Sequence, residues 1–235
     1  MIPENVLAPS ACVVHVGCFK DREKAKQAVT ESLNRIKYPD GSKLLLEVSS
    51  GEGNDLGESI DEIIEILTNT RQDIHKHLGI CLDTCHLFAS GQYDLRTIQD
   101  IDKLISDVHK SPFPIGLIHL NDSKGPFESR KDRHADIACG HIWGQDQECL
   151  RYLLSWMKKQ SIPSVVETHS PEDPMILQKI WRQEPVNRKK CLFEPDYETE
   201  TIPKDEQKKK SSPPISDKKS LKNSQDFLSK WLNKK

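Results

Sequence analysis

Short aliphatic segments alternate with amphipathic helical segments along most of this chain, and this alternation constrains the fold more than any other feature. Strands separated by helices form βαβ units, whose strands lie parallel in one sheet. The expected strands are Cys12–Val16, Lys43–Val48, Gly79–Asp83, Pro114–Leu120 and Ser164–Glu167, and the expected helices are Asp21–Ile36, Leu56–Leu67, Thr97–His109, Asp146–Lys159 and Pro174–Arg182. The pattern therefore predicts an α/β domain.

Each expected strand carries a metal-capable side chain at its last or next-to-last position. These side chains are His15, Glu47, Asp83, His119 and Glu167. The carboxyl ends of parallel strands meet at one face of the sheet, which is where α/β proteins bind their ligands. We therefore expect the five side chains to face one another.

Two further pairs of metal-capable residues lie just beyond strand ends. Asp83 and His86 are three residues apart on an expected turn, and Asp132 and His134 are two apart, so an extended chain places them on the same side. Taken singly, each could be a structural histidine or a helix-capping carboxylate. The joint pattern favours a metal site, and mixed imidazole and carboxylate ligands suit zinc or manganese better than calcium.

The charge is distributed unevenly along the 235 residues. The formal net charge is −2, but residues 186–235 hold 13 Lys and Arg against 8 Asp and Glu, while residues 1–185 hold 21 against 28. The basic segment has few apolar residues, so we expect a folded domain over 1–185 and a largely disordered tail over 186–235.

Other features of the sequence indicate an intracellular protein. We find no apolar run long enough to span a membrane, and no signal-peptide pattern between Ile2 and Val14. The cysteine count of seven is odd, which argues against a secreted disulfide framework and predicts reduced thiols.

Three segments closely resemble the signature stretches of endonuclease IV, the zinc-dependent apurinic/apyrimidinic endonuclease family of DNA base excision repair. They are Gly79–Gly91, His119–Lys124 and Asp132–His134. The segments Val14–Gly17, Leu46–Gly53 and Val165–Thr168 are similar to further stretches of that family, and the match runs in order from about residue 11 to residue 182.

The resemblance implies a TIM barrel with up to three zinc ions, or manganese, at its C-terminal face. It implies that His15 and Glu47 bind the first metal, that Glu47 bridges to a second held by Asp83, His119 and Glu167, and that His86, Asp132 and His134 bind the third. The implied reaction is hydrolysis of the phosphodiester 5′ to an abasic site, together with trimming of blocked 3′ ends. Glu47 or Glu167 would orient the attacking water.

The chain departs from the family pattern in several places. The family barrel has eight strands and this chain matches about five βα units, so the first metal would lack one histidine ligand. The spare imidazoles that could replace it are His75, His77, His141 and His169. Glu52 stands where the family has Gln, and Ala138 and Trp143 stand where it prefers glycine. We therefore expect the loop after His134 to take a different path.

Two other functions remain open at this point. Related barrels that isomerise or epimerise sugars place His, Asp and Glu on the same face. A non-catalytic remnant that binds DNA or a repair partner would also fit a barrel with missing units.

The end of the chain resembles a sliding-clamp-binding motif. Gln225, Leu228 and Trp231 fit the pattern, while Leu232 replaces the commoner second aromatic residue. One helical turn would gather the three apolar side chains into a plug. The alternative is an amphipathic helix that folds back on the barrel. The lysine run at 208–210 could direct the protein to the nucleus or contact DNA; otherwise we expect a cytoplasmic protein.

Overall fold

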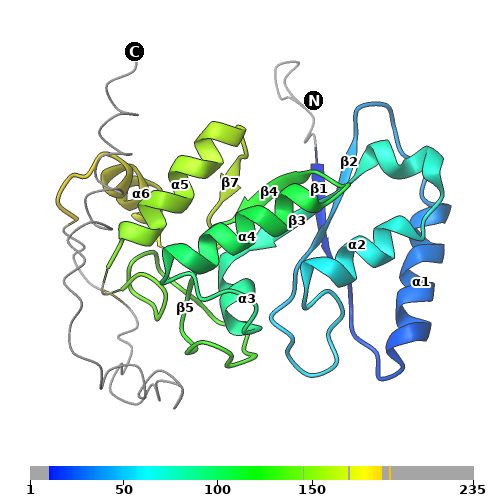
Figure 1. The fold of residues 1–235 in the computed structure, drawn as a ribbon, viewed down its shortest axis with the longest axis horizontal. Helices are drawn as coiled ribbons and strands as arrows, with labels where there is room; N and C mark the ends of the chain where they lie inside the picture. The colour runs from blue at the N-terminus through cyan, green and yellow to red at the C-terminus, as the bar shows by residue number, and fades with distance from the viewer. Residues whose placement is uncertain (1–10, 145, 169, 187–190, 192–235) are drawn as a thin grey trace. The chain divides into compact units, whose positions relative to one another are not determined.

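The protein is described here from a computed structural model, which covers residues 11–144, 146–168, 170–186 and 191 (Figure 1). The chain divides into two compact units, Met1–Tyr197 and Glu198–Lys235, and all described residues belong to the first. The clamp-binding motif and most of the expected tail lie outside the described residues.

One parallel sheet organises the first unit. Its strands run in the order β1-β2-β3-β4-β7, with bounds β1 Ala11–His15, β2 Lys43–Glu47, β3 Leu78–Asp83, β4 Ile115–His119 and β7 Ser164–Val165. The register sets His15 opposite Glu47 and Asp83 opposite His119. The parallel arrangement predicted from the sequence is confirmed, and the register staggers the strand ends: Glu47 lies opposite Cys81, two residues before the end of β3.

Helices connect successive strands, as βαβ units require (Figure 1). They are α1 Arg22–Arg35, α2 Ile60–Thr68, α4 Ile98–Lys110, α5 Glu148–Gln160 and α6 Asp173–Trp181. The side chains of Asp21, Ser59 and Thr97 each accept a backbone N–H in the first turn of the helix that follows, which explains where α1, α2 and α4 begin. Among the described helices, none is both long and apolar enough to cross a membrane.

The strands separate two environments, because successive side chains point to opposite faces. Leu46, Ile80 and Ile118 are buried in the main core with the helices. Leu45 points to the other face and lies across two glycines of neighbouring strands: a Cβ at Gly116 would come within 2.6 Å of Leu45 Cδ2, and one at Gly79 within 2.8 Å. Leu45 therefore forms an apolar floor beneath the polar strand ends.

Four short elements were not expected. A 3-10 helix, η1, covers Gln72–His77, and a two-stranded antiparallel pair joins β5 Asp122–Ser123 to β6 His134–Ala135. The segment after Asp83, expected to be a turn, forms helix α3 over Thr84–Ala89. That prediction was wrong because the Asp83 carboxylate accepts the His86 N–H at 2.8 Å and so caps a helix.

The prediction that all cysteines are reduced is also contradicted. Cys139 and Cys191 form a disulfide whose Cα atoms are 5.7 Å apart, within the usual range for such bonds. The two residues are separated by 52 positions, so only the folded chain brings them together. The other five cysteines are free, and three of them are buried.

Candidate metal centre

Four side chains meet where the central strands end. Glu47, Asp83, His119 and Glu167 each place one potential ligand atom within 4.8 Å of the others. His119 Nδ1 lies 2.9 Å from Glu47 Oε1 and 3.0 Å from Glu167 Oε2. It also lies 3.9 Å from Asp83 Oδ2. One imidazole nitrogen thus faces three carboxylates, an arrangement that needs a proton or a metal ion at its centre.

The strand ends supply these side chains in slightly different ways. Glu47, Asp83 and His119 are the last residues of β2, β3 and β4, and all three are buried. β7 ends two residues earlier than expected, so Glu167 reaches the cluster from the loop that follows it, with its side chain 37% exposed. Glu167 is therefore the carboxylate of this group that is most open to solvent.

A second cluster lies beside the first and consists of His86, Asp132 and His134. Asp132 Oδ1 is 3.1 Å from His86 Nε2 and 3.3 Å from His134 Nε2. His134 Nε2 is also 3.6 Å from Asp83 Oδ2, so Asp83 borders both clusters. The sequence pairs Asp83–His86 and Asp132–His134 are thus brought together at one place.

The two histidines of the second cluster test whether a metal ion fits there. Nε2 of His86 and Nε2 of His134 are both buried, and neither makes a hydrogen bond within the described part of the chain. His86 Nδ1 instead lies 2.8 Å from the carbonyl oxygen of Val48, to which it can donate. Nε2 is thus the ring nitrogen that faces Asp132, and it is the one that would bind a metal, as in a metal-binding histidine whose other nitrogen is held by a carbonyl. The donor set fits a divalent ion.

The electrostatics of the second cluster agree with that fit. Burial disfavours a charged His86, but the carboxylates of Asp83 and Asp132 outweigh it and raise the pKa of His86 to about 10. The adjacent His86 imidazole holds the pKa of Asp132 at about 2, against the opposing effect of burial. The site therefore attracts positive charge strongly, which is the condition for binding a cation.

His15 stands at the open side of the first cluster. Its Nε2 is 3.6 Å from Glu47 Oε2, whereas Glu47 Oε1 faces His119, so the two oxygens of Glu47 point at different imidazoles. The His15 side chain is 61% exposed, and its ring lies 5.7 Å from that of His86. Glu47 thus has the placement that a bridging carboxylate needs.

Two of the spare imidazoles lie away from this side of the site. His75 and His77 belong to η1, which precedes β3 and so lies at the opposite edge of the sheet from the strand ends. His77 Nδ1 contacts the carbonyl oxygen of Ser42 at 2.9 Å. The backbone N–H of His141 donates to Ser123, and His169 lies outside the described residues.

The residues that depart from the family pattern are accommodated. Glu52 accepts the backbone N–H of Asp132 at 3.1 Å, and its carboxylate lies 3.7 Å from Arg133 Nη1. Ala138 adopts a φ of 60°, the left-handed conformation that glycine tolerates best. Trp143 is fully buried in the core. Glu52 thus keeps an acceptor role that a glutamine could also fill.

Sequence reasoning assigned no role to Asn121, which contacts the first cluster directly. Its Nδ2 donates to Asp83 Oδ2 at 2.6 Å and to Glu167 Oε2 at 3.2 Å, while its Oδ1 accepts the Glu167 N–H at 3.0 Å. The only signal was its position two residues after His119 within the His119–Lys124 segment, because an amide is not a typical zinc ligand.

Two buried thiols also border the clusters. Cys81 Sγ lies within 4.8 Å of a potential ligand atom of Glu47 and of one of His119. Cys85 Sγ lies within the same distance of such atoms of Asp83 and His134. Burial, reinforced by the nearby carboxylates, raises the pKa of both thiols well above the usual range. They are therefore protonated at neutral pH and line the site as small apolar groups.

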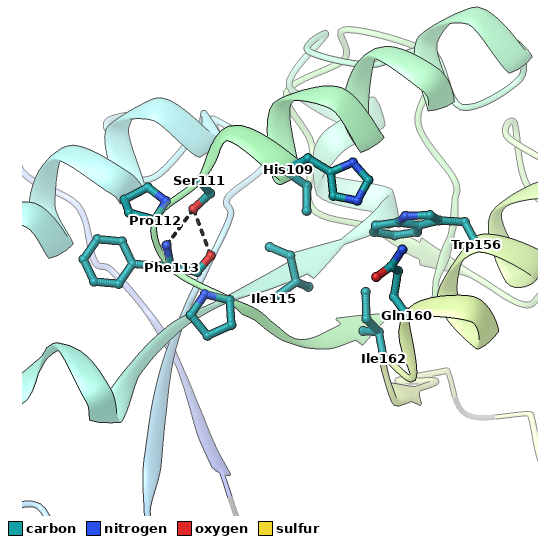
Figure 2. Close-up of a pocket in the computed structure, with 10 residues that line it drawn as sticks. His109, Ser111, Pro112, Phe113, Ile115, Trp156, Gln160 and Ile162 are labelled. Atoms are coloured by element: carbon teal, nitrogen blue, oxygen red, sulfur yellow. Dashed lines mark hydrogen bonds between the residues drawn. The ribbon is translucent and has the colours of Figure 1, made fainter.

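A separate hollow of about 430 Å³ lies between the end of α4, the start of β4 and α5. Figure 2 shows its wall: Ser111 is hydrogen-bonded to Phe113 on one side, and Trp156 and Ile162 stand on the other. Because it opens at the start of β4, it lies at the opposite edge of the sheet from the clusters. The hollow takes no part in the candidate metal centre.

Comparison with known proteins gives a consistent result. The model of the xylose isomerase-like TIM barrel family matches residues 9–184. A probable endonuclease 4 of Clostridium botulinum is 39% identical over 146 residues, which is 60% of this chain and 49% of the relative. A probable endonuclease 4 of Alkaliphilus oremlandii is 34% identical over 169 residues, covering 67% of this chain and 56% of the relative. The chain thus spans about half the length of these curated relatives.

Solved structures show the same likeness. The crystal structure of endonuclease IV from Thermus thermophilus superposes with a TM-score of 0.59 and 26% identity, over 74% of this chain and 61% of that one. A D-tagatose 3-epimerase-like protein superposes with a TM-score of 0.51 at 19% identity, which shows the fold alone. The five parallel strands are therefore part of a TIM-type barrel.

Proposed function

Because the chain belongs to the xylose isomerase-like TIM barrel family and resembles the endonuclease IV proteins in it, we propose that it is a metal-dependent endonuclease. Its substrate is abasic DNA, and its reaction is cleavage of the phosphodiester 5′ to the abasic site, with trimming of blocked 3′ ends. The observation that carries the proposal is the pair of carboxylate–imidazole clusters, in which two buried imidazole nitrogens have no hydrogen bond within the described part of the chain.

The two clusters together with His15 would hold up to three divalent ions, zinc by preference or manganese. His15 and Glu47 would hold one, Asp83, His119 and Glu167 with Glu47 a second, and His86, Asp132 and His134 a third. When bound, the ions would neutralise the phosphodiester, lower the pKa of a bound water and stabilise the departing oxygen.

The protein's own residues would position the reactants. Glu47 and Glu167 were equal candidates for orienting the attacking water. The Glu47 side chain is only 3% exposed, whereas that of Glu167 is 37% exposed. This difference supports Glu167 as the group that accepts a hydrogen bond from the water, and Glu47 as the group that holds His15 and His119 apart. His15, the most exposed imidazole of the site, stands where the DNA would approach.

The test is incision of a duplex that carries one tetrahydrofuran abasic analogue, which cannot be cleaved by β-elimination. We expect incision on the 5′ side that leaves a 3′-hydroxyl, stops on addition of a chelator and returns with zinc or manganese. Elemental analysis should find more than one metal ion per chain. His134→Ala should lower incision at least about 100-fold, because it removes a ligand from an already small donor set.

His75→Ala is the matched control, since that imidazole lies at the opposite edge of the sheet, and it should leave incision unchanged. Equal incision by wild type and His134→Ala would contradict the proposal. Epimerisation of a ketohexose without DNA incision would favour the sugar-converting alternative, and binding of abasic DNA without incision would favour the non-catalytic one.

We propose in addition that residues 225–232 bind a sliding clamp. The support is the spacing of Gln225, Leu228, Trp231 and Leu232, with lysines at the end of the chain for electrostatic steering. A peptide covering residues 220–235 should bind the cognate clamp, and Leu228→Ala combined with Trp231→Ala should abolish binding. Equal binding by both peptides, or by neither, would refute this part of the proposal.

A further inference from the structure

Asp122 is a buried carboxylate that the proposed chemistry does not use. It has no exposed surface, and within the described residues its donors are backbone N–H groups: Ser123 and Ile142 donate to Oδ1 at 2.8 and 2.9 Å, Gly140 donates to Oδ2 at 2.9 Å, and the Trp143 N–H contributes as well. A buried carboxylate is costly unless donors surround it. Apart from Ser123, these donors lie in the loop that follows β6.

The backbone of Asp122 also belongs to β5, the strand that pairs with β6 and therefore with the segment that carries His134. β5 pairs with β6 so that Asp122 faces Ala135 and Ser123 faces His134. The next bond of this ladder joins the Lys124 N–H to the Arg133 carbonyl at 2.8 Å. Because β6 is only two residues long, this short ladder alone gives His134 little support.

The loop beyond β6 closes back on Asp122. The His141 N–H donates to the Ser123 carbonyl at 2.8 Å, and the chain at Gly140 passes so close that an added Cβ would lie 2.4 Å from Asp122 Oδ1. Asp122 therefore holds the chain that follows His134 in two ways: its backbone pairs with Ala135 in β6, and its side chain anchors the loop beyond β6.

We propose that Asp122 is a positioning residue for the third metal, which fixes His134 against Asp132 and Asp83. The inference rests on the proposed function. His134 Nε2 lies 3.3 Å from Asp132 Oδ1 and 3.6 Å from Asp83 Oδ2, so a shift of about 1 Å in β6 would separate the ligands. Asp122 acts through this placement and touches neither metal nor DNA.

Asp122→Asn tests the proposal with little change of shape. The amide keeps one acceptor oxygen, but its NH₂ group would face the Gly140 N–H or the two donors at Oδ1. We expect the variant to fold and to lose about one bound zinc per chain by elemental analysis. The zinc concentration that half-saturates incision should rise about 10- to 100-fold while the rate at saturating zinc is kept.

An unchanged incision rate at saturating zinc distinguishes a positioning role from a general loss of structure. A general loss of structure would lower the incision rate at any zinc concentration. Leu153→Ala on α5, a buried core position remote from the clusters, is the stability-matched control: it should lower the melting temperature and leave zinc content and half-saturation unchanged. If Asp122→Asn does not fold, Gly140→Ala crowds the same contact from the loop side and should raise the half-saturating zinc concentration in the same way.

An unshifted zinc dependence with full zinc content in Asp122→Asn, or in Gly140→Ala where the first variant does not fold, would overturn the role of Asp122 and leave the proposed function standing. Wild-type protein that holds no zinc would instead overturn the proposed function, and the role of Asp122 with it.

Discussion

Asn121 illustrates how a residue that binds no metal can still shape a metal centre. The orientation of its amide follows from its bonds: Oδ1 accepts the Glu167 N–H, so Nδ2 must face the carboxylates of Asp83 and Glu167. Without a donor between them, the negatively charged carboxylates of Asp83 and Glu167 would repel each other. The amide therefore links the two carboxylates and keeps both at the same cluster.

We predict that Asn121→Asp weakens zinc binding at the first cluster by about 10- to 100-fold. The new carboxylate would face Asp83 and Glu167 with no donor between them, so the three would repel one another. Competition with a zinc indicator, titrated on metal-free protein, measures the affinity. Asn34→Asp is the control, because Asn34 accepts the Arg71 N–H at an exposed site away from the clusters. Unchanged zinc affinity in Asn121→Asp would show that the amide has no such role.

At the scale of elements, the strands and long helices could be predicted because their apolar residues repeat with the period of the structure. Each of the five strands is found within two residues of its expected bounds, and the helix expected from Leu56 begins later, at Ile60, where Ser59 provides the cap. Since parallel strands end at one edge, the same pattern also predicted which side chains would meet there.

The shorter elements could not be predicted in this way. Helix α3 and the strands β5 and β6 have six and two residues, fewer than a periodic pattern needs to be visible. They are held by side-chain hydrogen bonds instead. The Asp83 carboxylate accepts the His86 N–H at the start of α3, and the Asp122 carboxylate accepts the Gly140 N–H in the loop after β6. This is why the sequence indicated Asp132 and His134 as a pair but did not indicate what holds them.

Function at a strand edge also depends on packing below it. Leu45, Gly79 and Gly116 form a close contact on the inner face of the sheet, one residue layer or more beneath Glu47 and His119. A pattern of apolar residues predicts that such positions are buried, but it does not show that two glycines make room for one leucine. The register, which sets Glu47 opposite Cys81 and Asp83 opposite His119, then fixes where each strand ends relative to its neighbours.

At the scale of the whole molecule, the sheet has two outer strands. Among the described residues, β1 pairs only with β2, and β7 pairs only with β4. Ala11, Cys12 and His15 of β1 are exposed, and Val165 of β7 is 47% exposed. Unpaired edge strands with exposed apolar side chains are templates for association with other chains.

We therefore predict that residues 1–235, produced as they stand, associate in solution. Light scattering after size exclusion should give an apparent mass above 26.8 kDa that rises with protein concentration. Val165→Lys should reduce the association, because a lysine on an edge strand opposes pairing with a second strand. Met175→Lys on α6 removes an equally exposed apolar side chain from a helix and should change the association less. A single species at the monomer mass over a hundredfold range of concentration would contradict the prediction, and would mean that the strand edges are protected within one chain.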